Sequence, residues 1–170
     1  NKDEGLDGLI TVEGGKYTTS RKLAENCLKI VAAKMGRSLG DSITEKHYLA
    51  GCEIKDLDAF LSDVQEKNND FSKSTMDYLG RNYGTEYTEV IKLAHADKAL
   101  AETLNEDGEI MAEVIYAVRN EMARTLPDIM MRRTGIGTLG NPGEDILRKV
   151  AQVAAKELKW DQARVEKEIA

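Results

Sequence analysis

Apolar residues recur at steps of three and four positions over most of this chain, and this spacing constrains the fold more than any other feature of the sequence. Such a period places apolar side chains on one face of an α-helix. The pattern begins at Thr18 or Thr19, the expected cap, and stops at Gly36. Its apolar positions are Leu23, Cys27, Ile30, Val31 and Met35. The spacing therefore predicts an amphipathic helix between the cap and Gly36.

The same period, together with capping residues, predicts further helices along the chain. Their expected ranges are 55–66, 72–83, 85–95, 108–124, 127–133, 141–158 and a last helix after Asp161. The 108–124 segment is apolar over more than half its circumference, so we expect it at the centre of the fold. Asn141 as cap, Pro142 at the first position and Glu144 at the third predict where the 141–158 helix starts. The predicted fold class is all-α, a multi-helix orthogonal bundle.

One short stretch has a different pattern. Residues 8–15, GLITVEGG, alternate in polarity and end in a glycine pair, which predicts a short strand that leads into a turn. A lone strand cannot form a sheet, so either its partners are absent or the segment packs irregularly. Elsewhere the low aromatic content of 5% favours helix over sheet.

Charge and cysteine content weigh against several kinds of site. The net charge of -6 and the pI near 5.1 speak against nucleic acid as a partner, because phosphate backbones require a basic face. Cys27 falls on an apolar helix face, so we expect a buried thiol in a reducing compartment rather than a disulfide with Cys52. The spacing of these two cysteines with His47 and His95 fits no compact ligand pair, so no metal site is predicted. No apolar run is long enough to cross a bilayer, and no signal peptide is visible.

The run GIGTLG at residues 135–140 matches the Gly-x-Gly-x-x-Gly pattern of dinucleotide binding. That pattern requires a preceding buried strand, whereas MMRRT before it is the end of a predicted helix. We therefore interpret the run as a connector between helices, with a phosphate loop as the alternative.

The run RNEMARTLPDIMMRRT at residues 119–134 is rich in arginine. It places Arg119, Arg124, Arg132 and Arg133 near Glu121 and Asp128. We favour ion pairs that tie the central helix to its successor, because arginines on an apolar helix usually pair or extend to solvent. A basic surface for an anion or a partner domain is the alternative.

The stretch VEGGKYTTSRKLAE at residues 12–25 carries the best candidate site. Its cations, Lys16, Arg21 and Lys22, lie at a helix start, where the helix dipole makes positive charge mildly unfavourable. The candidate site residues are Gly14, Gly15, Lys16, Tyr17, Thr18 and Thr19. The glycines permit close backbone approach to a ligand, the hydroxyls add hydrogen bonds, and the N–H groups of the first helical turn point the same way. These features predict a site for an anion or an electron-rich carbonyl; a plain connection with solvated lysines is the alternative.

Residues 7–25, DGLITVEGGKYTTSRKLAE, resemble the segment where the FAD-dependent glycerol-3-phosphate dehydrogenases leave their flavin-binding domain. The runs YGTEYTEVIKLA and EIMAEVIYAVRNEMARTLPDIMMRRTGIG, and the helical tail, are similar to that family's C-terminal helical domain. The resemblance covers nearly the whole chain and is less clear from Ser38 to Asp70. It implies that residues 1–17 are a remnant strand and turn of the FAD-binding domain, and that residues 18–170 form the C-terminal helical domain.

The resemblance also implies an activity. The full enzyme would oxidise sn-glycerol 3-phosphate at C2 to dihydroxyacetone phosphate, with FAD as hydride acceptor and a quinone as electron acceptor. Oxygen would replace the quinone in a glycerol-3-phosphate oxidase. The turn from Gly14 to Thr19 would run past the flavin, and Lys16 would reach the substrate phosphate or the flavin edge. The phosphate-clamping arginines and the nucleotide-binding glycines would lie in an N-terminal FAD-binding domain outside this chain.

We therefore expect a fragment that stabilises the flavin domain, supplies one active-site loop and is inactive alone. The unpaired strand and the start at Asn1 rather than Met fit this expectation. We expect a cytoplasmic location, with peripheral attachment of the full enzyme to the cytoplasmic membrane as an alternative. A free-standing helical module that binds a protein partner is the alternative of another functional class.

Overall fold

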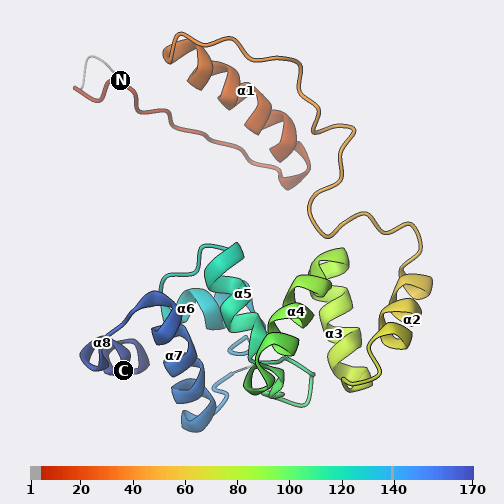
Figure 1. Ribbon diagram of the computed structural model, residues 1–170. Coiled ribbons are helices and arrows are strands. Elements are labelled where there is room, and N and C mark those ends of the chain that lie inside the picture. Colours follow the sequence, from red (N-terminus) through yellow and green to blue (C-terminus); the bar gives the residue numbers. More distant parts are fainter. Residues whose placement is uncertain (1–4, 139) are drawn as a thin grey trace. The chain divides into compact units, whose positions relative to one another are not determined.

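The computed structural model describes residues 5–138 and 140–170 (Figure 1). Its contacts divide the chain into two compact units, Asn1–Tyr48 and Leu49–Ala170, here called unit 1 and unit 2. All regular elements among the described residues are helical, apart from an isolated bridge between Thr103 and Ile110. The all-α prediction is confirmed. The assignment of residues 1–17 to a neighbouring domain stays a prediction.

Unit 1 contains a 3-10 turn, Tyr17–Thr19, followed by helix α1, Ser20–Lys34. The helix ends before Gly36, as the sequence predicts. Residues 8–15 form no strand in the described part of the chain, because a strand ladder needs a second strand to pair with. Both alternatives considered above, absent partner strands and irregular packing, fit this segment.

The apolar face of α1 is only partly covered within unit 1: Leu23, Cys27 and Val31 are half-buried. Only Ala32 of this helix is buried, whereas Leu28, Ile30 and the following Met35 are 58%, 52% and 58% exposed. Cys27 is partly buried, and both it and the exposed Cys52 are free thiols. The helical period is therefore confirmed, whereas the Cys27 thiol, which we expected to be buried, is only partly buried.

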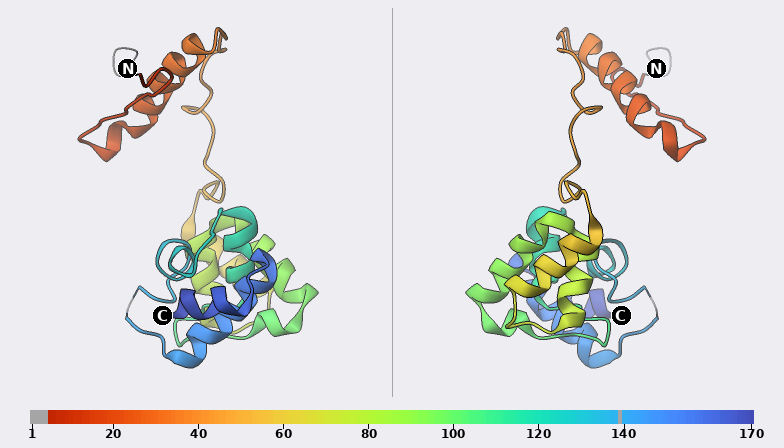
Figure 2. Two further views of the ribbon diagram at one scale, coloured as in Figure 1. Left: turned by 90° about the vertical axis from the view of Figure 1, so that its left-hand side faces the viewer. Right: turned by 90° about the vertical axis from the view of Figure 1, so that its right-hand side faces the viewer.

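Unit 2 begins with three helices: α2, Leu57–Lys67; α3, Lys73–Tyr83; and α4, Tyr87–Ala96. The side chains of Asp56 and Ser72 cap α2 and α3 by accepting backbone N–H groups at 3.0 Å and 3.1 Å. Helix α2 packs along α3 (Figure 2). Gly84, which has a φ of +53°, ends α3, and a Cβ there would collide with the carbonyl oxygen of Gly51. This close approach fixes the first residues of unit 2 against the α3–α4 corner.

Helix α5, Ala112–Asn120, is shorter at both ends than the predicted 108–124. The chain before it folds back as a turn, in which the N–H of Met111 donates to the carbonyl of Glu102 at 2.9 Å. After it, Met122 has a φ of +62°, a left-handed conformation that ends the helix. Periodicity continues past both ends because Ile110, Met111 and Ala123 are also buried, so it overestimates the length.

The remaining elements are α6, Leu126–Asp128; a π-helical segment, Ile129–Arg133; α7, Glu144–Leu158; and α8, Gln162–Ile169. The predicted start of α7 is wrong by two residues: Asn141 accepts the N–H of Gly143 instead of capping the helix, which begins at Glu144. Asp161 caps α8 as expected. Over the described ranges, no helix has the length and apolar character needed to cross a membrane.

Two hydrophobic clusters form the core of unit 2, and α5 contributes to both. One joins α5 to α6, α7 and α8, and the other joins α5 to α2, α3 and α4. Every residue from Ala112 to Val118 is buried. The prediction that this helix lies at the centre is confirmed, because a helix that is apolar on most sides must be covered on most sides.

Candidate functional site

The predicted site residues Gly14–Thr19 form one continuous turn at the N-terminal end of α1. Lys16 adopts an extended backbone and precedes the 3-10 turn, and the Thr19 hydroxyl donates to the carbonyl of Lys16 at 3.0 Å. All six residues are exposed, and the Tyr17 side chain is 96% exposed. A Cβ on Gly14 would lie 2.7 Å from the Leu23 side chain, so this backbone passes close to α1.

The 3-10 turn changes which backbone donors are free. The N–H of Thr19 donates to Lys16 and the N–H of Ser20 donates to Tyr17, so the first turn of α1 has fewer free donors than we expected. The N–H groups of Tyr17 and Thr18 are the ones without an acceptor inside the turn. These two donors remain for an acceptor on a bound ligand.

The three cations of this stretch are not equivalent. Lys22 and Lys29 each donate to Glu25 at 2.8 Å, and Arg21 lies 3.5 Å from the same carboxylate. The hydrogen bonds from Lys22 and Lys29 lower the pKa of Glu25 to about 2. Within the described residues, Lys16 forms no ion pair or side-chain hydrogen bond. Lys16 is therefore the cation of this turn that is available for a ligand, and Glu25 is the residue that the sequence interpretation missed, although its spacing of three from Lys22 was a signal.

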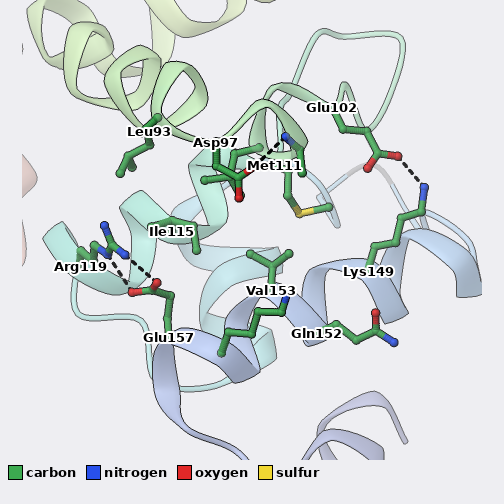
Figure 3. Close-up of a pocket in the computed structure, with 14 residues that line it drawn as sticks. Leu93, Asp97, Glu102, Met111, Ile115, Arg119, Lys149, Gln152, Val153 and Glu157 are labelled. Carbon is green, nitrogen blue, oxygen red and sulfur yellow. Dashed lines mark hydrogen bonds and ion pairs between the residues drawn. The ribbon is translucent and has the colours of Figure 1, made fainter.

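A separate pocket of about 390 Å³ lies in unit 2, between α4, α5 and α7 (Figure 3). Its floor is apolar, with Met111, Ile115 and Val153. Two ion pairs stand at its rim: Lys149 with Glu102 at 2.5 Å, and Arg119 with Glu157 through two hydrogen bonds of 2.8 Å and 2.6 Å. Rim charges that neutralise each other give no preference for the sign of a ligand, so the pocket alone does not indicate a site.

Two glutamates are buried in unit 2 and were not predicted as special. Glu113 accepts the N–H of Ile110 at 2.7 Å and the hydroxyl of Tyr83 at 2.9 Å. Glu109 accepts the hydroxyl of Tyr78 at 2.6 Å. Burial raises the pKa of Glu113 to about 8, against the two hydrogen bonds that lower it. Both carboxyl groups are closed off from solvent and occupied by protein donors, so they organise the fold rather than hold a ligand.

The glycine run at residues 135–140 connects the π-helical segment to α7. The N–H of Gly137 donates to the carbonyl of Met130 at 3.0 Å, and the Thr138 hydroxyl donates to the carbonyl of Gly135 at 2.8 Å. Leu139 lies outside the described residues. No strand precedes the run among the residues described, as a dinucleotide site would require.

The arginine run behaves partly as expected. Arg132 pairs with Asp128 at 2.7 Å, within the run. Arg119 ties α5 to α7 through Glu157 rather than to the next helix along the chain, which corrects our favoured interpretation. Over the described ranges, no cluster of three or more His, Cys, Asp or Glu side chains could hold a metal ion.

Comparison with known proteins identifies relatives over almost all of the sequence. Residues 42–165 match the family described as the C-terminal domain of alpha-glycerophosphate oxidase. The chain is 31% identical over 171 residues to a glycerol-3-phosphate dehydrogenase of Synechocystis sp., covering 99% of this chain and 31% of the relative. It is 32% identical to a probable mitochondrial glycerol-3-phosphate dehydrogenase of Dictyostelium discoideum, covering 95% of this chain and 25% of the relative. With the mitochondrial glycerol-3-phosphate dehydrogenase of Bos taurus it shares 29% identity, covering 98% and 23%. The chain thus spans less than a third of the length of these relatives.

Proposed function

This chain belongs to the family described as the C-terminal domain of alpha-glycerophosphate oxidase, and from that premise we propose that it is the C-terminal helical part of an FAD-dependent glycerol-3-phosphate dehydrogenase. The whole protein oxidises sn-glycerol 3-phosphate to dihydroxyacetone phosphate and passes the electrons to a quinone. The names of the relatives support the substrate, since each is a glycerol-3-phosphate dehydrogenase. The partner of this chain is the N-terminal FAD-binding domain of the same polypeptide, at a cytoplasmic location.

The partly uncovered apolar face of unit 1 is the observation that carries the proposal. Ile30 and Met35 of the apolar stripe, and the nearby Leu28, are each more than half exposed, which is unusual for apolar residues of an amphipathic helix. Burying the exposed part of each would contribute about 1 kcal/mol, since complete burial of such a side chain contributes roughly 1.5–3 kcal/mol. A flavin domain that covers this face would gain that free energy and would position the turn before α1.

The division of the chain supports this assignment with a later boundary between its two parts. The family match begins at residue 42, close to the boundary between Tyr48 and Leu49. Unit 1 lies almost entirely outside the matched range, and it contains the residues that resemble the end of a flavin-binding domain. We therefore extend the proposed flavin-domain segment from residues 1–17 to the whole of unit 1, including α1, and leave unit 2 as the helical domain.

The turn at residues 14–19 fits a flavin and a phosphorylated substrate. Lys16 offers an uncommitted cation, and the N–H groups of Tyr17 and Thr18 offer donors for a carbonyl oxygen. Gly14 and Gly15 keep side chains out of the approach. When bound, FAD supplies the hydride acceptor for the oxidation of the C2 alcohol. Lys16 would hold the phosphate or the flavin edge.

Replacement of Lys16 in the longer protein tests the site. We expect Lys16→Ala to raise KM for glycerol 3-phosphate about 10- to 100-fold, because a hydrogen bond to a charged group contributes ~1.5–3 kcal/mol. Lys16→Arg should recover part of the loss. Lys46→Ala, which removes an exposed cation of the same unit, is the matched control and should leave KM unchanged. Unchanged kcat and KM in Lys16→Ala would refute the site, and a longer protein without bound flavin or turnover would refute the function.

A glycerol-3-phosphate oxidase is the second candidate, because the matched family is named after an oxidase. The two differ in the electron acceptor. Reduction of a quinone analogue without oxygen consumption supports the dehydrogenase, whereas stoichiometric hydrogen peroxide formation supports the oxidase.

A further inference from the structure

Residues 121–133, which follow α5 and contain α6 and the π-helical segment, form a surface that we call the arginine corner. Asp128 organises its backbone: one carboxylate oxygen accepts the N–H groups of Arg124 and Thr125 at 3.0 Å each, and the other pairs with Arg132 at 2.7 Å. The Thr125 hydroxyl accepts the N–H of Asp128 at 3.2 Å. These bonds, together with the N–H of Leu126, which donates to Glu168 of α8 at 2.7 Å, hold the corner in one arrangement, so its exposed side chains start from a fixed backbone.

Two guanidinium groups of the corner form no ion pair within the described residues, although the charge of Arg133 acts on Glu121 of the same corner and opposes the rise in the pKa of that carboxyl group. In residues 49–170, Arg81, Arg119, Arg132, Arg148 and Arg164 all form ion pairs with carboxylates. The exposed side chains of Arg124 and Arg133 form no ion pair or hydrogen bond with any described residue. Both unpaired arginines of unit 2 therefore lie in one segment of a chain whose net charge is -6.

The corner also contains three features that are incomplete or unfavourable by themselves. Met122 adopts a left-handed conformation with a φ of +62°, and its side chain is 77% exposed. Met131 is 56% exposed. One carboxylate oxygen of Glu121 is buried without a hydrogen-bond partner. Strained backbone, exposed methionines and unsatisfied buried oxygens occur where a further partner completes a surface.

We propose that the arginine corner binds an acidic protein segment, with Arg124 and Arg133 pairing with its carboxylates and Met122 and Met131 contacting its apolar side chains. Arginine suits this role because its planar donors bind carboxylates in pairs. The methionines favour a protein over a nucleic acid, and two cations on an acidic chain are too few for a phosphate backbone. This surface belongs to unit 2, whereas the turn at residues 14–19 belongs to unit 1.

The acidic segment lies in the part of the longer polypeptide that precedes this chain, and to that extent the inference rests on the proposed function. The relatives are at least three times longer than this chain, so most of the surface available to the corner belongs to that part. A covalently linked segment also needs only a weak contact, because linkage gives an effective concentration on the order of millimolar.

Carbodiimide coupling in the longer protein tests the contact. Arg124→Lys and Arg133→Lys keep the charge and supply an amine that couples to a touching carboxylate. We expect cross-linked peptides that join position 124 or 133 to an Asp or Glu of the preceding part. Arg148→Lys is the matched control, because its partners Glu144 and Glu166 lie within this chain. Absence of cross-links from the corner, while the control couples, overturns the proposal, as do cross-links that join two copies of the protein.

Charge reversal gives a second measurement that does not depend on coupling chemistry. In the longer protein, Arg124→Glu with Arg133→Glu should make amide hydrogen exchange across residues 121–134 about tenfold faster, the factor for losing ~1.4 kcal/mol. The control, Lys73→Glu with Lys92→Glu, reverses two exposed charges on α3 and α4 and should leave that exchange unchanged. Unchanged exchange in the arginine variant, or protection that appears only on addition of a DNA oligonucleotide, contradicts the proposal. A protein that cross-links as expected but lacks flavin and turnover would refute the proposed function alone.

Discussion

The buried carboxyl group of Glu113 should make the stability of this protein fall as pH rises. Its side chain is 0% exposed, and its pKa is raised to about 8 by burial, whereas the reference value for an exposed glutamate is 4.5. The nearby carboxyl groups of Glu109 and Glu121 add to the rise. Between the two values the native state keeps a proton that the unfolded state has released, so unfolding becomes easier with each pH unit.

The size of the effect follows from the pKa difference. Each pH unit above the unfolded-state pKa lowers the free energy of unfolding by ~1.4 kcal/mol, so at pH 7 the total loss is on the order of 3 kcal/mol. The cost stops growing above the native-state pKa of about 8, where Glu113 ionises in the folded protein as well. Below the unfolded-state pKa both states are protonated, and the group contributes no pH dependence.

Glu113→Gln isolates this effect. The amide cannot ionise, its oxygen can still accept the N–H of Ile110, and its nitrogen can donate to the hydroxyl oxygen of Tyr83. Urea unfolding of both proteins at pH 5, 6.5 and 8 should give similar free energies of unfolding at pH 5 and an advantage for the variant that grows by ~1.4 kcal/mol per unit above it. All other titrating groups are common to both proteins and cancel. Parallel pH profiles would refute the reasoning, because they would mean that Glu113 ionises equally in both states.

Two further substitutions test the turns that shape unit 2. Gly84→Ala should lower the free energy of unfolding by roughly 3 kcal/mol in urea titrations, because a Cβ there meets the Gly51 carbonyl and the φ of +53° is unfavourable for alanine. The control Gly40→Ala has open space around it and should change the free energy of unfolding little. A stable Gly84→Ala protein would show that this corner can move. Thr125→Ala removes one half of the capping box at α6 and should lower the free energy of unfolding by about 1 kcal/mol, whereas Thr125→Ser should keep it. Equal unfolding midpoints for the original protein and both variants would argue against the cap.

The sequence by itself determined the helices of this protein, because the interactions that specify them are local. Asp56, Ser72 and Asp161 each cap a helix by accepting an N–H three positions ahead, so capping depends only on nearby residues. The central position of α5 was also predictable, since its apolar residues surround the helix. The predicted start at Asn141 failed because its side chain bonds to Gly143 in a competing local turn.

The tertiary structure decided what the local pattern leaves open. Periodicity shows that α1 has an apolar face, but not whether this chain covers it, and the exposure of Ile30 and Met35 emerges only when all contacts are known. The partner of Arg119 is Glu157, 38 positions away, and no spacing rule connects them. Whether Arg124, Arg133 and Lys16 remain without an ion pair likewise depends on where every carboxylate lies in the folded chain. Ion pairs form between charged groups that lie close together in space, and only the folded chain determines those distances.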